Sequence, residues 1–328
     1  MHASVLNRYK GYQSLVKDVP AGLSFVGCLT ALLNHAGRAV SYAYLAGVTG
    51  EAFKSHYRYD DPRVCFLSEI DFFEAATRAT GVRFDLRSSG ALDQAWARVR
   101  AAIDAGRPVL TSHAEALVIT GYRHGAIVFW DEAAQGEPQE MALDEFARTW
   151  SAWYPGAEMQ GFLTATVGEM GALPDRRAVA LQALKQGLSL SRPHWGPRGA
   201  HAGSAAYAAF AADLRNTPSR DFAQSREWLG LATVDHLARS KLAAAAFLRE
   251  ISDDLPEAAR PHLERAASLY AEENQCWDQW RRLTDPFDPS DHSRRNPAAD
   301  AILNCARCQK QVVLELESAA QKAESPPP

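Results

Sequence analysis

The residue types of this chain change near position 171, and this change limits the folds it can adopt more than any single motif does. Up to that point, short runs of β-branched and aromatic residues alternate with amphipathic segments. After the stretch Gly171-Ala172-Leu173-Pro174, the chain is rich in Ala, Leu and charged residues and has almost no β-branched runs. β-Branched residues favour strands, whereas Ala and Leu favour helices. We therefore expect two domains, residues 1–170 with mixed helices and strands and residues 171–323 with helices alone.

Hydrophobic periodicity places the elements of the first domain. A 3.6-residue period predicts helices at residues 26–36, 67–80, 91–105 and 142–152. Strand-like runs occupy residues 82–86, 108–111, 116–122, 127–130 and 162–167. A short turn with Gly125 joins residues 117–122 to residues 126–130, a pattern typical of a β-hairpin. The expected fold class is α+β, with an antiparallel sheet behind a helical layer.

The second domain shows helical periodicity throughout. Its expected helices cover residues 175–190, 202–215, 221–252, 257–284 and 297–322, separated by Pro or Gly. Residues 324–328 end in three prolines and are expected to form a disordered tail. Because Ala-rich amphipathic helices can bury a face within the chain or against a copy of it, both a monomer and a homo-oligomer fit the pattern.

Charge and cysteine content narrow the partners and the compartment. With 35 basic and 39 acidic side chains and a formal charge of -4, the chain is not expected to bind nucleic acid or a membrane surface, and a small-molecule substrate is favoured. No apolar run is long enough to predict a transmembrane helix. An odd number of irregularly spaced cysteines, without an apolar leader, favours reduced thiols in the cytoplasm: Cys28, Cys65, Cys276, Cys305 and Cys308.

Cys28 is the candidate nucleophile. A helix that opens near Ser24 or Gly27 places Cys28 in its first turn, where free amides and the helix dipole lower the pKa of a thiol. The alternative is that Cys28 fills space between helix and sheet, because cysteine is among the most frequently buried residue types. The sequence leaves both interpretations open.

The order of motifs around Cys28 is similar to that of a known family. Residues 28–37 (Cys-Leu-Thr-Ala-Leu-Leu-Asn-His-Ala-Gly) are followed by residues 44–53 (Tyr-Leu-Ala-Gly-Val-Thr-Gly-Glu-Ala-Phe). Residues 106–110 (Gly-Arg-Pro-Val-Leu), residues 118–122 (Val-Ile-Thr-Gly-Tyr) and Asp131 come next. This order resembles the C39-like branch of the papain-like cysteine peptidases, and most closely the N-terminal domain family of butirosin biosynthesis protein H, in which a helical domain commonly follows. The resemblance implies a papain-like fold and acyl transfer or amide, ester or thioester hydrolysis in a biosynthetic pathway.

The proton-transfer group has two candidates. The resembled families place a His at the start of the strand that ends in Gly-Tyr, where this chain has Glu115, with His113 two residues earlier. If His113 is the base, then Cys28, His113 and Asp131 would act as nucleophile, base and orienter. If Glu115 takes that position, its charge raises the pKa of the thiol. Glu115 would then bind a cation or act alone as general acid or base.

Further residues are candidate substrate contacts. Papain-like enzymes carry a Gln shortly before the nucleophile, and the nearest one here is Gln13, so Ser24 or the amide of Cys28 would bind the oxyanion. Glu51 and His56 lie in a region dense in polar and aromatic groups, the kind of segment that often carries binding residues. Tyr122, the last member of this set, is an aromatic residue of a kind that more often fills the core of a hairpin than contacts a ligand.

Two other segments attract attention. Residues 191–201 contain two His, two Arg and a Trp and are interpreted as a lid or as a long connector. Cys305 and Cys308 have the spacing of a metal or redox pair, but they lie in a helical pattern without a second pair, so a structural role is expected. Nothing in the sequence calls for a metal or an organic cofactor.

These observations lead to three hypotheses. The favoured one is an acyltransferase or hydrolase that uses Cys28, with an acyl carrier protein as a candidate partner, as the resemblance implies. The second is a non-catalytic papain-like binding module in which Glu115 recognises a cationic ligand. The third is a structural protein whose helical domain docks a carrier or another subunit.

Overall fold

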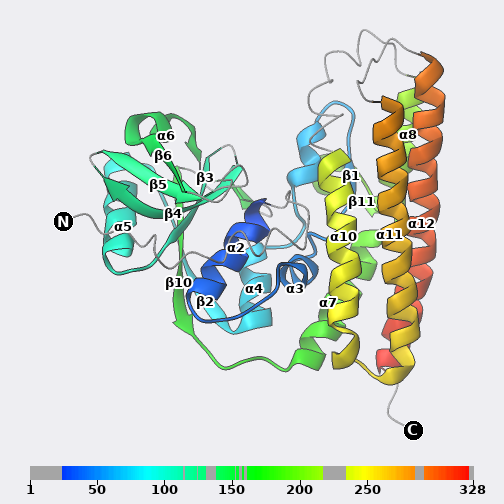
Figure 1. The fold of residues 1–328 in the computed structure, drawn as a ribbon, viewed down its shortest axis with the longest axis horizontal. Coiled ribbons are helices and arrows are strands. Elements are labelled where there is room, and N and C mark those ends of the chain that lie inside the picture. The colour runs from blue at the N-terminus through cyan, green and yellow to red at the C-terminus, as the bar shows by residue number, and fades with distance from the viewer. Residues whose placement is uncertain are drawn as a thin grey trace. The chain divides into compact units, whose positions relative to one another are not determined.

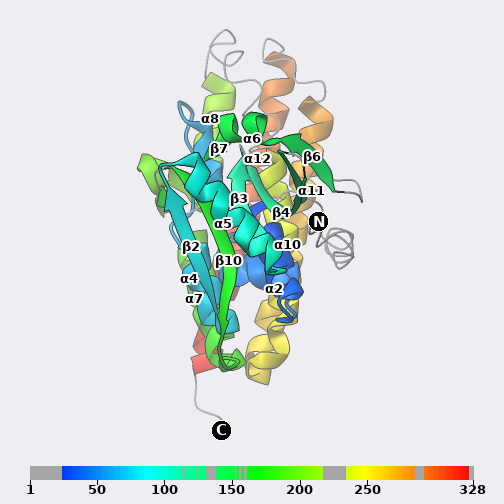
Figure 2. The ribbon, with the colours of Figure 1, turned by 90° about the vertical axis from the view of Figure 1, so that its left-hand side faces the viewer.

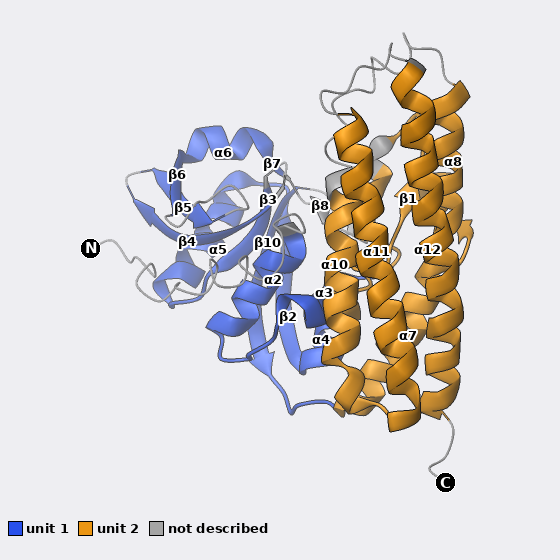
Figure 3. Cartoon of the chain, turned by 45° about the vertical axis from the view of Figure 1, so that its right-hand side comes forward, with its two compact units in different colours: residues 1–45, 70–174 blue, residues 46–69, 175–328 orange. Residues whose placement is uncertain are grey.

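The computed structural model describes residues 24–113, 115–123, 125–130, 138–151, 153–154, 157–158, 161–216, 234–284 and 292–324. The chain forms two compact units (Figure 3). The first comprises Met1–Leu45 and Ile70–Pro174, and the second comprises Ala46–Glu69 and Asp175–Pro328. The first is built around an antiparallel sheet and the second around long helices, which confirms the α+β class.

An antiparallel sheet forms the centre of the first unit (Figure 1). Its strands run in the order β2 (Val82–Ser89), β10 (Phe162–Met170), β3 (Val109–His113), β4 (Glu115–Arg123), β5 (Ala126–Trp130) and β6 (Gln139–Ala142), and β7 (Trp150–Ser151) pairs with β3. A separate two-stranded ribbon consists of β8 (Trp153–Tyr154) and β9 (Ala157–Glu158). The expected hairpin is present as β4 and β5, with Gly125 in the turn at a positive φ of 80°.

Helices cover both faces of this sheet (Figure 2). On one face, α5 (Leu92–Asp104) packs Val99 and Ile103 against Val109 and Ile119, and α6 (Leu143–Thr149) adds Phe146 to the same core. Strand residues alternate between faces, so Leu110 and Val118 point the other way, toward the side where α2 (Ser24–His35) packs on β3 and β4. The helix that carries Cys28 and the helix α5 therefore lie on opposite faces of the sheet.

Helix α4 (Phe72–Thr80) begins later than its hydrophobic pattern predicts. The side chain of Asp71 caps its N-terminus by accepting a hydrogen bond from the amide of Glu74 at 3.0 Å. Gly81 ends it in the left-handed conformation, with φ of 70°. Residues 67–71, expected to be helical, instead form the connection between the 3₁₀ helix η2 (Pro62–Phe66) and α4, with Leu67 in an extended conformation.

Long helices make up most of the second unit: α7 (Arg176–Ser191), α8 (Ser204–Asn216), α10 (Val234–Glu250), α11 (Arg260–Thr284) and α12 (His292–Glu324). Short 3₁₀ segments, η3 (Pro197–Gly199), η5 (Ser252–Asp254) and η6 (Glu257–Ala259), connect some of them. Aromatic side chains such as Tyr207, Phe210, Trp277 and Trp280 fill the core. None of the helices in the described ranges is long and apolar enough to cross a membrane. Glu324 ends α12, and the rest of the predicted tail lies outside the described residues.

Residues 46–69 belong to the second unit, although the sequence analysis assigned them to the first domain. The division falls within α3 (Tyr42–Val48). Phe53 is fully buried, and its ring lies 5.8 Å from that of Phe247 and 6.0 Å from that of Tyr270. Burying a side chain of this size contributes about 2 kcal/mol. A Cβ on Gly47 would lie 2.1 Å from the ring of Phe247, so only glycine permits this packing.

A small sheet also ties residues 46–69 to the second unit. Strand β1 (His56–Tyr57) pairs with β12 (His201–Ala202), and β12 pairs with β11 (His194–Trp195), all antiparallel. The stacked rings of Tyr57 and Phe210 lie 4.8 Å apart beside it. Residues 191–201, interpreted from sequence as a lid or connector, thus supply two strands of this sheet.

Candidate functional site

Cys28 is the fifth residue of α2 and is fully buried, with 0% of its surface exposed. Since the helix begins at Ser24, the amide of Cys28 is in position to donate to the carbonyl of Ser24 within the helical ladder. The expectation that Cys28 lies in the first turn with a free amide therefore needs correction. Only the amides before Cys28 remain available at this helix end.

His113 and Glu115 occupy adjacent strand ends. His113 is the last residue of β3 and Glu115 the first of β4, and their backbones pair directly across the two strands. Helix α2 packs against both of these strands. The side chains of Ser24, His113 and Glu115, and the whole of Asp131, lie outside what the structure describes.

Tyr122 is held by α5. Its hydroxyl donates to Oδ1 of Asp104 at 2.8 Å, and its ring meets the edge of Trp96 at 5.7 Å. The hydrogen bond to Asp104 raises the pKa of Tyr122. Because α5 covers the face opposite to α2, the structure does not bring Tyr122 together with Cys28.

Glu51 lies in the second unit within a buried ionic cluster. Its carboxylate contacts Nζ of Lys54 at 2.7 Å and Nε2 of His236 at 3.1 Å. Burial alone would raise the pKa of Glu51, but Lys54 and His236 outweigh burial and lower it. Lys54 also donates to the carbonyl of Leu67 at 3.2 Å. With its carboxylate oxygens engaged in this way, Glu51 anchors its own segment, and the substrate contact expected for it has no support here.

A second buried network secures the same segment. Lys241 of α10 donates to the carbonyl of Lys54 at 3.1 Å and to the hydroxyl of Ser55 at 2.9 Å. Ser55 lies 2.8 Å from the hydroxyl of Tyr207, which donates to Glu273 of α11 at 2.5 Å. Burial raises the pKa of Glu273 to about 7 and lowers that of Lys241. All four side chains are fully buried.

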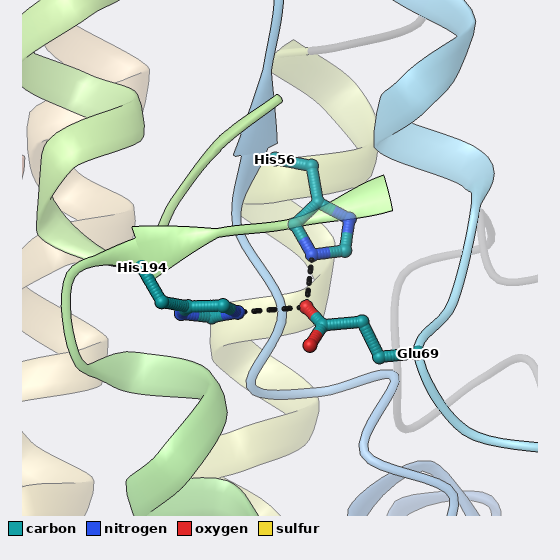
Figure 4. A group of neighbouring side chains, drawn as sticks. All are labelled: His56, Glu69 and His194. Carbon is teal, nitrogen blue, oxygen red and sulfur yellow. Dashed lines mark hydrogen bonds and ion pairs between the residues drawn. The ribbon is translucent and has the colours of Figure 1, made fainter. Parts of the chain in front are cut away.

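His56 lies in a different environment, together with two residues that the sequence analysis did not select. Nε2 of His56 is 3.0 Å from Oε1 of Glu69, and Nε2 of His194 is 2.8 Å from the same oxygen (Figure 4). We call His56, Glu69 and His194 the His-Glu-His group. Its donor atoms lie within 4.8 Å of one another, close enough to hold one metal ion.

The His-Glu-His group combines burial with access to solvent. The side chain of His56 is 0% exposed, whereas those of Glu69 and His194 are 32% and 27% exposed. Burial alone raises the pKa of Glu69, but the hydrogen bonds from both histidines lower it. For His194, burial lowers the pKa, but the hydrogen bonds to the carbonyl of Arg192 and to Glu69 raise it. The arrangement can therefore hold a positive charge, from a proton or a metal ion, between imidazole and carboxylate.

Cys305 and Cys308 lie on α12 near a third thiol. Cys276 of α11 hydrogen-bonds to both, and these bonds lower the pKa of Cys276 to about 3. Cys305 is buried, whereas Cys276 and Cys308 are partly exposed. No disulfide joins any of the five cysteines, all of which are described. The spacing of Cys305 and Cys308 gave no sign of Cys276, because the third thiol comes from another helix.

Comparison of the sequence with models of known protein families and with curated proteins finds no match.

Proposed function

We propose that the protein carries out cysteine-dependent acyl chemistry, in which Cys28 accepts an acyl group from a small amide, ester or carrier-bound thioester. One observation supports this proposal above the others. Cys28 lies near the start of a helix that packs on β3 and β4, the two antiparallel strands whose paired ends carry His113 and Glu115. The resemblance to papain-like enzymes implies this arrangement, in which the helix that carries the cysteine packs on the strands that carry the base.

The proposed reaction has two halves. The Cys28 sulfur attacks the acyl carbonyl carbon, a C–S bond forms, and the leaving amine, alcohol or thiol departs with a proton from the protonated base. An acceptor amine or water then attacks the acyl carbon, gives its proton to the base, and releases the Cys28 thiolate. His113, oriented by Asp131, or Glu115 is the base. The first-turn amides of α2 and the hydroxyl of Ser24 are the donors proposed for the oxyanion.

The test is direct detection of the acyl-enzyme. The full chain is incubated with a small acyl thioester, digested under acidic conditions, and the acylated peptide is identified by mass spectrometry. We expect one acyl group on Cys28 that a primary amine or water removes. Cys65 is the matched control, because it is also buried in the chain and the proposal gives it no role.

Variants identify the groups involved. Cys28→Ser should abolish the adduct and Cys65→Ser should leave it unchanged. His113→Asn and Glu115→Gln should slow acylation unequally, and the slower one marks the base. If no adduct forms at Cys28, or if Cys65 is acylated equally fast, the acyl proposal is wrong.

A second candidate is a papain-like binding module without catalysis. The complete burial of Cys28 favours it, because a sulfur at 0% exposure reaches a substrate only after local opening. In this case Glu115 recognises a cationic amine or guanidinium. Agmatine, as a probe, should raise the melting temperature of the wild type and of Cys28→Ser, but not that of Glu115→Gln. For both candidates we propose a cytoplasmic location, on the five cysteines without disulfides, and for the first an acyl carrier protein as donor.

A further inference from the structure

We infer that the His-Glu-His group of the second unit binds a divalent transition-metal ion, zinc being the expected one. This inference does not depend on the chemistry proposed for Cys28. It rests on the strand register, the hydrogen bonds of the two imidazoles and the separations of the three donor atoms.

The strand register brings the two histidines to the same level of the small sheet. His56 on β1 and His194 on β11 are both paired with Ala202 on the central strand β12. Directly paired residues point to the same face of a sheet, and strands two apart are separated by about 9.5 Å. The small side chain of Ala202 leaves the space between the imidazoles to Glu69, which enters from the connection after η2. Three distant segments thus converge on one carboxylate oxygen.

The hydrogen bond between His194 and the carbonyl of Arg192 determines which ring nitrogen of His194 carries the proton. Nδ1 of His194 lies 2.8 Å from the carbonyl of Arg192, and a carbonyl only accepts, so Nδ1 carries a proton. In the neutral ring, Nε2 then carries no proton, and its lone pair faces a carboxylate oxygen of Glu69 at 2.8 Å. Two lone pairs at this distance repel each other unless a proton or a metal ion lies between them. A backbone carbonyl on the remote nitrogen is the usual support of a metal-binding histidine.

The ring of His56 is positioned by close packing. A Cβ on Gly196 would lie 3.0 Å from Cδ2 and 3.2 Å from Nε2 of this imidazole. Glycine at position 196 therefore lets the backbone approach the ring next to its ligating nitrogen. A Cβ at this position would require the ring to shift by a few tenths of an ångström.

The distances suit an ion with short bonds to nitrogen and oxygen. With bonds of about 2.0–2.1 Å, ligand atoms in a tetrahedral zinc site lie about 3.3 Å apart. The observed contacts of 3.0 and 2.8 Å to Glu69 would lengthen slightly, and the two imidazole nitrogens already lie within 4.8 Å of each other. The partly exposed Glu69 and His194 allow these shifts. Two imidazoles and one carboxylate suit zinc and its neighbours rather than calcium or magnesium. Three protein ligands leave a fourth position for water or a substrate.

A similar group in the same unit lacks the second imidazole. His262 and Arg265 of α11 both contact Glu315 of α12, at 2.7 and 3.0 Å. Here a guanidinium takes the place of the second imidazole, and a guanidinium has no lone pair for a metal. The His262 group is therefore a matched control, with the same carboxylate–imidazole contact and no capacity for a second nitrogen ligand.

The experiment uses the full chain after treatment with a chelator. Equilibrium dialysis against Zn²⁺ should give one tightly bound ion per chain, and Co²⁺ should give the visible bands of a tetrahedral nitrogen and oxygen site. Glu69→Gln keeps the size of the side chain and removes its charge, and it should weaken Zn²⁺ binding by more than about 100-fold, since loss of a supporting residue alone costs 10–100-fold. His194→Ala should do the same, and His262→Asn should have no effect.

The three thiols Cys276, Cys305 and Cys308 provide a competing site, and the spectrum separates the two. Thiolate ligands would add an intense near-ultraviolet band to the Co²⁺ protein, and Cys276→Ser would remove it. Three results would overturn the inference. They are a wild type that binds no stoichiometric ion, binding that survives both Glu69→Gln and His194→Ala, and binding that is lost only with Cys276→Ser.

Discussion

The two units bury different kinds of polar side chain. In the described part of the first unit, the buried polar side chains are hydroxyls, and several donate to backbone carbonyls, as Thr30 does to Val26 at 2.7 Å and Thr111 to Leu163 at 2.6 Å. The second unit buries acidic, basic and histidine side chains: Glu51, Lys54, His56, His236, Lys241, Glu273 and Arg295. Buried charges are costly unless they are paired, so this difference indicates where the molecule holds its titratable groups in fixed geometry.

The difference has a consequence for each site. In the described part of the first unit, which contains Cys28, no charged or imidazole side chain is buried. In the second unit, a buried polar network attaches residues 46–69 to α8, α10 and α11 through Tyr207, Lys241 and Glu273. The same attachment holds His56 where it meets Glu69 and His194.

The largest expected effect is on removal of Lys241. Lys241→Met would leave the carbonyl of Lys54 and the hydroxyl of Ser55 without their donor and Glu273 without the opposite charge. We expect the free energy of unfolding to fall by about 3–5 kcal/mol. Urea denaturation, followed by the fluorescence of Trp277 and Trp280 in the core of this unit, measures the change.

The control for Lys241 is an exposed ion pair. Arg249 contacts Glu264 at 3.0 Å with both side chains about half exposed, and Arg249→Met should cost less than about 1 kcal/mol. Equal effects of the two variants would remove the contrast between the units.

The second expected effect is a pH dependence of the second unit. The pKa of Glu273 rises from 4.5 to about 7 on folding, so across this range the folded state holds a proton that the unfolded state has released. The free energy of unfolding should therefore fall as the pH rises from about 4.5 to about 7, by on the order of 3 kcal/mol.

Glu273→Gln isolates this contribution to the pH dependence. Gln keeps an acceptor for the hydroxyl of Tyr207 and does not titrate, so the stability of this variant should vary less with pH over the same range. If wild type and variant show parallel pH profiles, Glu273 is ionised in the folded protein and the raised pKa is wrong.

The smallest expected effect is in the first unit. Cys28→Ala removes one buried sulfur and should lower the free energy of unfolding by about 1 kcal/mol. Thermal unfolding of wild type and variant measures the change. A loss as large as that of Lys241→Met would remove the contrast between the two units.

Periodic patterns predicted most helices and strands because these depend on neighbouring residues. The segments expected at 91–105 and 175–190, for example, correspond to α5 and α7. The start of α4 was missed because the cap by Asp71 outweighs the apolar residues before it. The division of the chain at position 171 assigned residues 46–69 to the first domain. Their partners, such as Phe247 and Tyr270, lie about 190 residues away or more in the sequence.

The candidate sites show the same limit. His56 was selected for its polar surroundings, but Glu69 and His194 were not, because their meeting depends on the pairing of β1 and β11 with β12. Two-residue strands carry too little alternation to be predicted. One feature of the sequence pointed to the segment that contains His194, namely the density of His, Arg and Gly in residues 191–201.

The interrupted order of the second unit also matters during synthesis. Phe53 and Tyr57 leave the ribosome long before Phe247, Tyr270 and Phe210, against which they pack. At about 5–20 residues per second, Phe53 waits on the order of ten seconds or more for Phe247. Through that interval an apolar segment of the nascent chain lacks its final partners, so translation speed and chaperone capture are expected to decide the yield of folded protein.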